Sequence, residues 1–184
     1  MMQTLTHELV KQEIHNWITN YLDVPSEHFN GHQPCPFAMP AWNADRVEIK
    51  VGAWASVLWA IDAFDDKKDL VIIAVPEGSY DGFEPFCEAK NQRLADQGSD
   101  LICIPFIPSN EGEEDPDIDP EAWGAITDHV YGMVFIQRLS TLNKVSRMLE
   151  REGYYRNVSE EFWKYITSRR ELETRHGRQE EVNG

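Results

Sequence analysis

The sequence contains few cysteines, fewer basic than acidic residues, and no long hydrophobic run. Its three cysteines, Cys35, Cys87 and Cys103, are too few and too scattered for a disulfide framework, and their odd number leaves at least one free thiol. This usage is typical of a reducing compartment. The apolar stretches are far shorter than the roughly 20 residues that span a bilayer, and the chain does not begin with a leader-peptide pattern. We therefore expect a cytoplasmic protein that does not cross a membrane.

The charge balance narrows the expected partners. Lysine and arginine number 17 against 32 acidic residues, a formal net charge of -15. Such a chain is repelled by nucleic acid and by anionic membrane surfaces unless a basic patch intervenes, and no basic run precedes the C-terminal tail. We therefore expect neither as a partner. With 184 residues, 41% of them hydrophobic, a single domain over 1–184 with its core in 6–167 is expected.

The order of apolar segments predicts an α/β fold. Residues 6–22 carry apolar side chains at helical spacing and should form an opening helix. A β-α-β-α-β pattern follows, the pattern of parallel strands joined by helical crossovers. Its expected strands are 46–51, 69–76 and 101–108, and its helices are 54–64 and 81–97, the second ended by Gly98. The prediction is a layered core with parallel strands, an N-terminal helix and a C-terminal helical segment.

The remainder reads as a loop followed by helices. Residues 111–121 contain seven acidic residues in eleven and two prolines, so they should form an exposed loop. Apolar spacing over 120–150 predicts one long helix, and Ser159 should cap a last helix. The tail 168–184 is expected to fray into solvent.

Residues 28–42, HFNGHQPCPFAMPAW, are the first candidate for a functional site. The spacing H-x3-H-x2-C could bring His28, His32 and Cys35 onto one zinc, copper or iron ion. His129, beside Asp128, is the best candidate for a further ligand. The alternative is that these histidines are only solvated loop residues.

The same stretch also permits thiol chemistry. Cys35 lies between two prolines, and nearby imidazoles could stabilise its thiolate. CPFA resembles the CPFC motif of glutaredoxins, but Ala38 stands where a second cysteine would be. Equally, Cys35 could be a small buried hydrophobe and Phe37 a core anchor. Cys87 and Cys103 lie in apolar segments, so core packing explains both.

Residues 128–144 place polar side chains within an apolar segment. Asp128, His129, Tyr131 and Arg138 could project into a pocket, where the Arg138 guanidinium could hold a carboxylate or phosphate. Alternatively, Asp128 and Arg138 lie on the outer face.

Several short motifs together resemble a bacterial family of uncharacterised function, the LCPFA-motif proteins (domain of unknown function 1415). The resemblance covers roughly residues 10–150 and includes an RVEI strand, a DGFEPF helix start and a strand that ends in F-x-P. It implies matches at Cys35, Pro36, Phe37, Ala38, Phe106, Pro108, Tyr131 and Arg138. The chain departs from the family pattern at Ile107 and Phe135, where the family has histidines, and at Asp128, where it has arginine. The resemblance thus implies a site location, where the family's imidazoles are either lost or replaced by His28, His32 and His129, but no activity.

These observations favour a small-molecule enzyme with a metal- or thiol-assisted site, acting on a small anionic metabolite. Cys35, His129 and Asp128 would be catalytic, and Arg138, Tyr131 and Phe37 would contact the substrate. The pocket should lie at the carboxyl ends of the parallel strands. The alternative is a noncatalytic interaction protein that forms a homo-oligomer or binds a partner protein, as six tryptophans and the acidic loop would suit.

Overall fold

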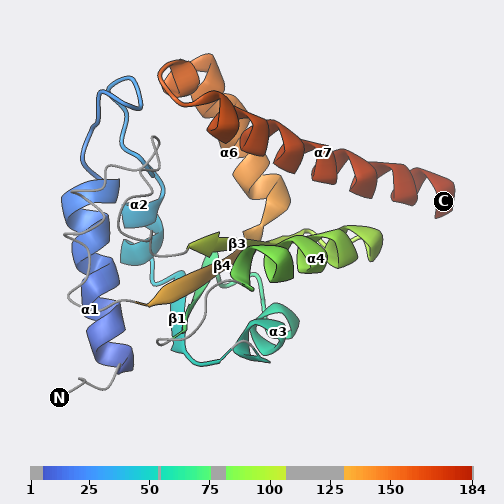
Figure 1. The fold of residues 1–184 in the computed structure, drawn as a ribbon, viewed down its shortest axis with the longest axis horizontal. Helices are drawn as coiled ribbons and strands as arrows, with labels where there is room; N and C mark the ends of the chain where they lie inside the picture. Colours follow the sequence, from blue (N-terminus) through green and yellow to red (C-terminus); the bar gives the residue numbers. More distant parts are fainter. Residues whose placement is uncertain (1–5, 54, 76–81, 107–130, 184) are drawn as a thin grey trace.

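A four-stranded mixed sheet forms the centre of the protein (Figure 1). The computed structural model describes residues 6–53, 55–75, 82–106 and 131–183, and the side chains within them up to Glu173. The spatial order of the strands is β1 (Val47–Val51), β2 (Leu70–Val75), β4 (Gly132–Arg138) and β3 (Leu101–Phe106). β1 and β2 pair in parallel, whereas β4 is antiparallel to both of its neighbours. β1, β2 and β3 therefore share one direction, and the predicted α/β fold is confirmed.

Helices cover both faces of the sheet. β2 alternates between them: Val71, Ile73 and Val75 pack toward α3 (Ala55–Asp62) and α4 (Phe83–Asp96). Ile72 and Ala74 pack toward α1 (His7–Trp17) and its π-helical continuation η1 (Ile18–Leu22), with α2 (Ala38–Asn43) beside them. A strand buried on both faces reads as a continuous apolar run, as LVIIAV does.

The sequence-based prediction is wrong for β4, which was expected to be part of a helix over 120–150. Val134 and Ile136 face α3 and α4, while Met133 and Phe135 face α1. A short apolar run fits a buried strand and a buried helix equally well by periodicity. The helical part begins only at α6 (Leu139–Arg151).

Side chains set the helix boundaries. Asp100, just before β3, accepts hydrogen bonds from the Ser140 backbone N–H at 2.8 Å and from the Ser140 hydroxyl at 2.5 Å, which fixes the start of α6. Gly98 follows α4 at a φ of 69°, a left-handed conformation that glycine adopts without strain. Ser159 accepts from the Phe162 N–H at 3.0 Å, so its predicted cap is confirmed.

The C-terminal tail does not leave the fold at residue 168. After a short 3-10 turn, η2 (Tyr154–Arg156), helix α7 (Glu160–Asn183) runs back beside α6 and α4 and on to the C-terminus (Figure 1). Arg169 is only 6% exposed and donates to Asn143 of α6 at 3.1 Å. The expectation of a frayed tail from 168 onward is therefore wrong. Among the described helices, none is long and apolar enough to cross a bilayer.

Candidate ligand-binding site

The histidine-rich stretch forms a stiff connector docked on the end of α6. Its turn passes through Asn30 and Gly31 at positive φ, and Ser26 bridges to His32. Phe29 is buried there and stacks on Tyr154 at 4.7 Å between ring centroids. The Tyr154 hydroxyl donates to the Pro34 carbonyl. Aromatic packing therefore holds this segment in place.

Cys35 lies within this connector and is half-buried. Burial raises its pKa, and the backbone N–H groups of Phe37 and Ala38 only partly offset this effect. The thiol therefore stays protonated at neutral pH, the opposite of what a nucleophilic cysteine requires. Burial also raises the pKa of Cys87 and of Cys103, each to about 12, in agreement with their place in the core.

The proposed metal ligands do not form a cluster. Within the described residues, no group of three or more His, Cys, Asp or Glu side chains is placed to hold a metal ion. The His28 ring meets Phe29 edge-on at 4.8 Å, while His32 Nδ1 lies 4.0 Å from a carboxylate oxygen of Glu152. His129 and Asp128 lie outside the described residues.

The predicted substrate contacts are also dispersed. Tyr131 precedes β4 and Arg138 ends it, so about seven residues at roughly 3.3 Å each separate them. Arg138 pairs with Asp66 at 2.5 Å and lies over the Phe64 ring. Phe37 is 40% exposed at the start of α2 rather than a core anchor. Tyr131 and Arg138 therefore lie at opposite ends of β4.

Sequence reasoning missed a buried acidic group near Tyr131. Glu13 of α1 is 8% exposed and Tyr131 is 4% exposed. Burial, followed by the charge and hydrogen bond of Glu13, raises the pKa of the Tyr131 phenol. The signal was a glutamate at a position that falls on the apolar face of the opening helix.

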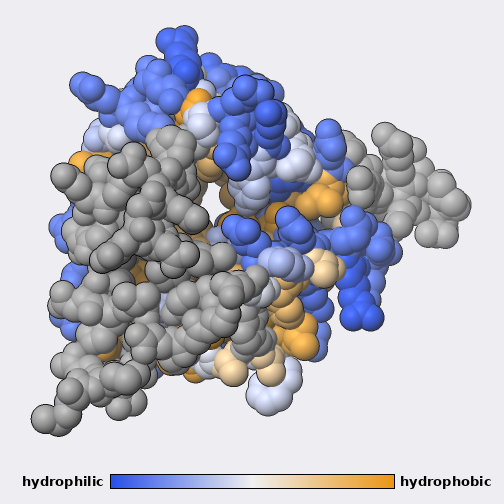
Figure 2. Space-filling view, viewed as in Figure 1, coloured by the Kyte–Doolittle hydropathy of each residue, from blue (hydrophilic) through white to orange (hydrophobic). Residues whose placement is uncertain are grey.

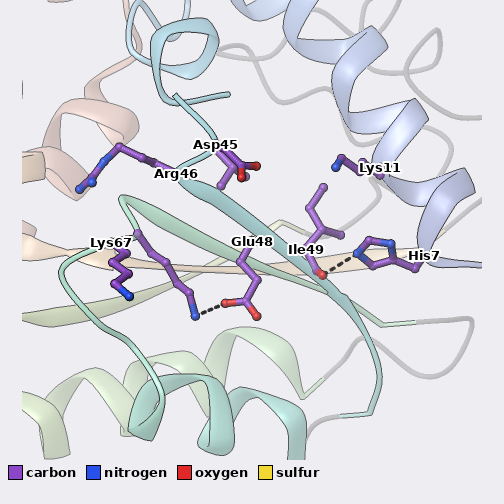
Figure 3. Close-up of a pocket in the computed structure, with 9 residues that line it drawn as sticks. His7, Lys11, Asp45, Arg46, Glu48, Ile49 and Lys67 are labelled. Atoms are coloured by element: carbon purple, nitrogen blue, oxygen red, sulfur yellow. Dashed lines mark hydrogen bonds and ion pairs between the residues drawn. The ribbon is translucent and has the colours of Figure 1, made fainter. Parts of the chain in front are cut away.

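A hollow of about 350 Å³ lies along β1 and is lined by nine residues from three segments of the chain. It is called the β1 hollow below. His7 and Lys11 come from α1, residues 45–49 from the start of β1, and Lys67 and Lys68 from the turn before β2. Consecutive strand residues point to opposite faces, so a hollow that touches all of 45–49 must follow the free edge of the strand. Figure 3 shows Arg46 and Lys67 on one side of β1 and His7 and Lys11 on the other.

Two of the four cations in the hollow are held by carboxylates. Arg46 binds Asp69 in a bidentate pair at 2.8 and 2.7 Å and thereby lowers the pKa of that carboxyl. Lys68 pairs with Glu48; although burial would raise the Glu48 pKa, its lysine partners lower it. Both pairs fix the walls of the hollow.

The other two cations, Lys11 and Lys67, have no carboxylate partner within the part of the chain that the structure describes. Lys11 lies 5.9 Å from the Trp42 ring centroid. His7 Nε2 is 3.0 Å from the Ile49 carbonyl, and since a carbonyl can only accept, this nitrogen carries the proton. The hollow therefore presents positive charge beside a strand edge in a chain with net charge -15.

This local basic patch was not expected from the sequence. It is assembled from Lys11, Arg46 and the pair Lys67-Lys68, which are distant in the chain. Arg46 and Lys68 each come just before a strand. Parallel strands bring their amino ends to the same side of the sheet, so this placement could have predicted that the two cations lie close together. The hollow therefore lies toward the amino ends of β1 and β2, whereas the sequence pattern predicted a site at the carboxyl ends.

Comparison with protein-family models, with characterised proteins and with solved structures returned no significant match. The resemblance to the LCPFA-motif family therefore stays a prediction.

Proposed function

We propose that the protein is a noncatalytic binding protein that holds a carboxylate- or phosphate-bearing ligand in the β1 hollow. The observation that carries this proposal is the position of Lys11 and Lys67, which have no carboxylate partner among the described residues and face the same hollow. Ammonium groups are suited to anions, and their selective placement in an acidic chain favours a binding role.

The neighbouring ion pairs support recognition of an anion. Arg46 and Lys68 are already paired with carboxylates, so their role is to hold the walls of the hollow in position. Within the hollow, four cations face the two carboxylates of Asp45 and Glu48. An incoming anion can therefore pair with Lys11 or with Lys67 without breaking an ion pair that the structure shows.

The cysteine chemistry favours binding over thiol catalysis. Burial raises the pKa of Cys35, Cys87 and Cys103, so none of the three thiols is poised as a thiolate at neutral pH. The proposed ligand is still a small anion, as expected from the sequence, but the proposed site is the β1 hollow and not the CPFA loop.

Titration calorimetry with inorganic phosphate and with succinate tests the proposal. The double variant Lys11→Gln/Lys67→Gln should weaken binding by at least about tenfold, whereas Lys11→Arg should retain most of the affinity. Lys144→Gln/Lys164→Gln, which removes two exposed lysines outside the hollow, is the matched control and should bind as the parent does. Equal loss in both double variants, or no heat with either anion, would contradict the proposal.

A second candidate function is self-association through α3. Trp59 on this helix is 74% exposed and Leu58 is 40% exposed. Figure 2 shows apolar residues along the lower margin of the molecule, where Figure 1 places α3. Exposed tryptophan is a frequent anchor of protein interfaces, and a twofold dimer would use the same patch on both copies.

Light scattering at increasing protein concentration tests this second candidate. The parent should show a dimer that Trp59→Gln converts to a monomer. Met148→Gln, at a residue of α6 that is 43% exposed, is the control and should leave the mass unchanged. A parent that stays monomeric throughout the concentration series would rule out self-association through α3.

A further inference from the structure

The outer edge of β3 is closed by side chains. The Asp100 carbonyl accepts a hydrogen bond from the Leu139 N–H, so Asp100 directs its backbone groups toward β4. Backbone groups of successive strand residues point to alternate edges. Those of Leu101, Cys103 and Pro105 therefore point away from the sheet. The Asn91 amide pairs with both backbone groups of Cys103 at 2.8 Å, and Ser99 Oγ accepts from the Leu101 N–H at 3.4 Å. Pro105 has no N–H. No further strand can add to this edge without displacing these partners.

The outer edge of β1 is different. The Arg46 carbonyl and the Gly52 N–H bond toward β2, at 2.9 Å to Asp69 and 3.0 Å to Ala74. The N–H and C=O groups of successive strand residues point to alternate edges, so the backbone groups of Val47, Ile49 and Val51 point away from β2. Within the described residues, the His7 ring on the Ile49 carbonyl is the sole bond recorded to these outward groups. Apart from the Ile49 carbonyl, where an added strand would replace the His7 ring, the outward backbone groups of β1 have no hydrogen-bond partner in the described part of the chain.

We infer that the β1 edge binds an extended acidic peptide segment, which adds to the sheet as a strand and places its carboxylates at Lys11 and Lys67. This inference rests on the proposed function and specifies its ligand. Main-chain hydrogen bonds give such strand addition its affinity, and side-chain sites give its specificity.

Charge and length support an acidic peptide as the occupant. β1 has five residues, so the edge accommodates a segment of similar length. Lys11 and Lys67 approach from opposite sides of the strand (Figure 3), and side chains of an added strand also alternate between two sides. A segment with acidic residues on both of its faces can therefore reach both ammonium groups. The net charge of -15 repels acidic peptides elsewhere, but screening over about 8 Å at physiological salt leaves the local cations dominant.

Fluorescence anisotropy and amide hydrogen exchange with a synthetic peptide test the inference. The probe is a capped peptide of alternating glutamate and valine, compared with the same peptide N-methylated at alternate amides and with a lysine-for-glutamate version. The first probe should bind and slow exchange of the Val47, Ile49 and Val51 amides. The N-methylated and lysine versions should bind at least about tenfold more weakly.

Two variants separate the edge from the charges. Val51 does not line the hollow. Val51→Pro removes an outward N–H and keeps the bonds to β2, so it should weaken binding of the peptide but not of succinate; Val51→Thr, which keeps the N–H, is its control. Lys11→Gln/Lys67→Gln should weaken both. If Lys11→Gln/Lys67→Gln weakens binding of both the peptide and succinate, but N-methylation of the peptide and Val51→Pro change nothing, strand addition is wrong and anion binding stands. If neither the peptide nor the small anions bind, the proposed function falls as well.

A second copy of the chain is the competing occupant of the edge. It would appear as dimerisation in the absence of peptide that Val51→Pro abolishes and Trp59→Gln does not. That result would overturn the assignment of the edge to an acidic peptide.

Discussion

The hydroxyl of Tyr154 donates a hydrogen bond to the backbone carbonyl of Pro34, which lies 120 residues earlier in the chain. The same ring stacks on Phe29 at 4.7 Å and tilts toward His32 at 5.9 Å. Burial raises the Tyr154 pKa, and the nearby Cys35 adds to this effect. Tyr154 is thus the main attachment of the CPFA connector to the helical end of the protein.

Removing this hydroxyl should loosen the connector without unfolding the protein. Tyr154→Phe keeps the stacking but leaves a buried carbonyl without its donor, at a cost of about 1 kcal/mol. Cys35, whose thiol the connector desolvates, should then react faster with iodoacetamide at pH 7.5, as followed by mass spectrometry of its peptide. Tyr155→Phe also removes a hydroxyl bond, that to Ser146 at 3.0 Å, and should leave Cys35 labelling unchanged. Equal labelling in the parent and both variants would show that Tyr154 does not control access to the thiol.

The amide of Asn91 predicts a second measurable effect. It both donates to the Cys103 carbonyl and accepts from the Cys103 N–H, each at 2.8 Å. Asn91→Ala leaves both groups unpaired and should reduce the free energy of unfolding by about 1 to 3 kcal/mol in urea titrations. Asn91→Asp should also destabilise, because a carboxylate accepts but cannot donate to the carbonyl. Gln92→Ala, at an exposed neighbour, should change stability by less than about 0.5 kcal/mol; a similar loss there would mean that helix propensity, not the edge bond, is measured.

Sequence patterns predicted the elements whose apolar periodicity was unambiguous. The strands near 46–51, 69–76 and 101–108, the two helices between them, and the caps at Gly98 and Ser159 agree with the structure. β4 was missed because the short run GMVFIQR is apolar on both faces, although its β-branched and aromatic residues were a signal for a strand.

The candidate site was harder to predict, for a physical reason. Local motifs drew attention to residues 28–42, but the β1 hollow is built by strand pairing, which joins Arg46 to Lys67 and Lys68 across the amino ends of β1 and β2. Polar partnerships such as Asn91 with Cys103 also depend on long-range geometry, and no spacing rule reports them. Prediction of this site therefore required the strand order first.

Alkaline pH should destabilise the protein through its core thiols. Burial raises the pKa of Cys87 and Cys103 from 9.0 to about 12, so the folded state keeps protons that the unfolded state loses above about pH 9. The stabilisation that these protonated thiols give the folded state is complete below pH 9 and is lost as the pH rises toward 12. The free energy of unfolding falls by at most about 1.4 kcal/mol per pH unit for each thiol. Cys103→Ala should therefore show a shallower decline of the unfolding free energy between pH 9 and 11 than the parent, whatever its offset at pH 7. Ser99→Ala is the control without a titrating group, and a Cys103→Ala slope equal to that of the parent would contradict a raised thiol pKa.

Asn143 joins α6 to α7 and should be the most sensitive polar residue of that interface. It is 0% exposed, accepts from Arg169 at 3.1 Å and donates to Glu173 at 3.1 Å. Asn143→Ala leaves the buried guanidinium of Arg169 without this acceptor, so unfolding titrations should show a loss of about 3 kcal/mol. In an Arg169→Met background, Asn143→Ala should reduce the free energy of unfolding less than it does in the parent. The difference should exceed about 0.5 kcal/mol, because no buried guanidinium is left without an acceptor. Thr141→Ala on the exposed side of α6 should be nearly neutral, and additive losses in the double variant would mean that Asn143 stabilises the interface independently of Arg169.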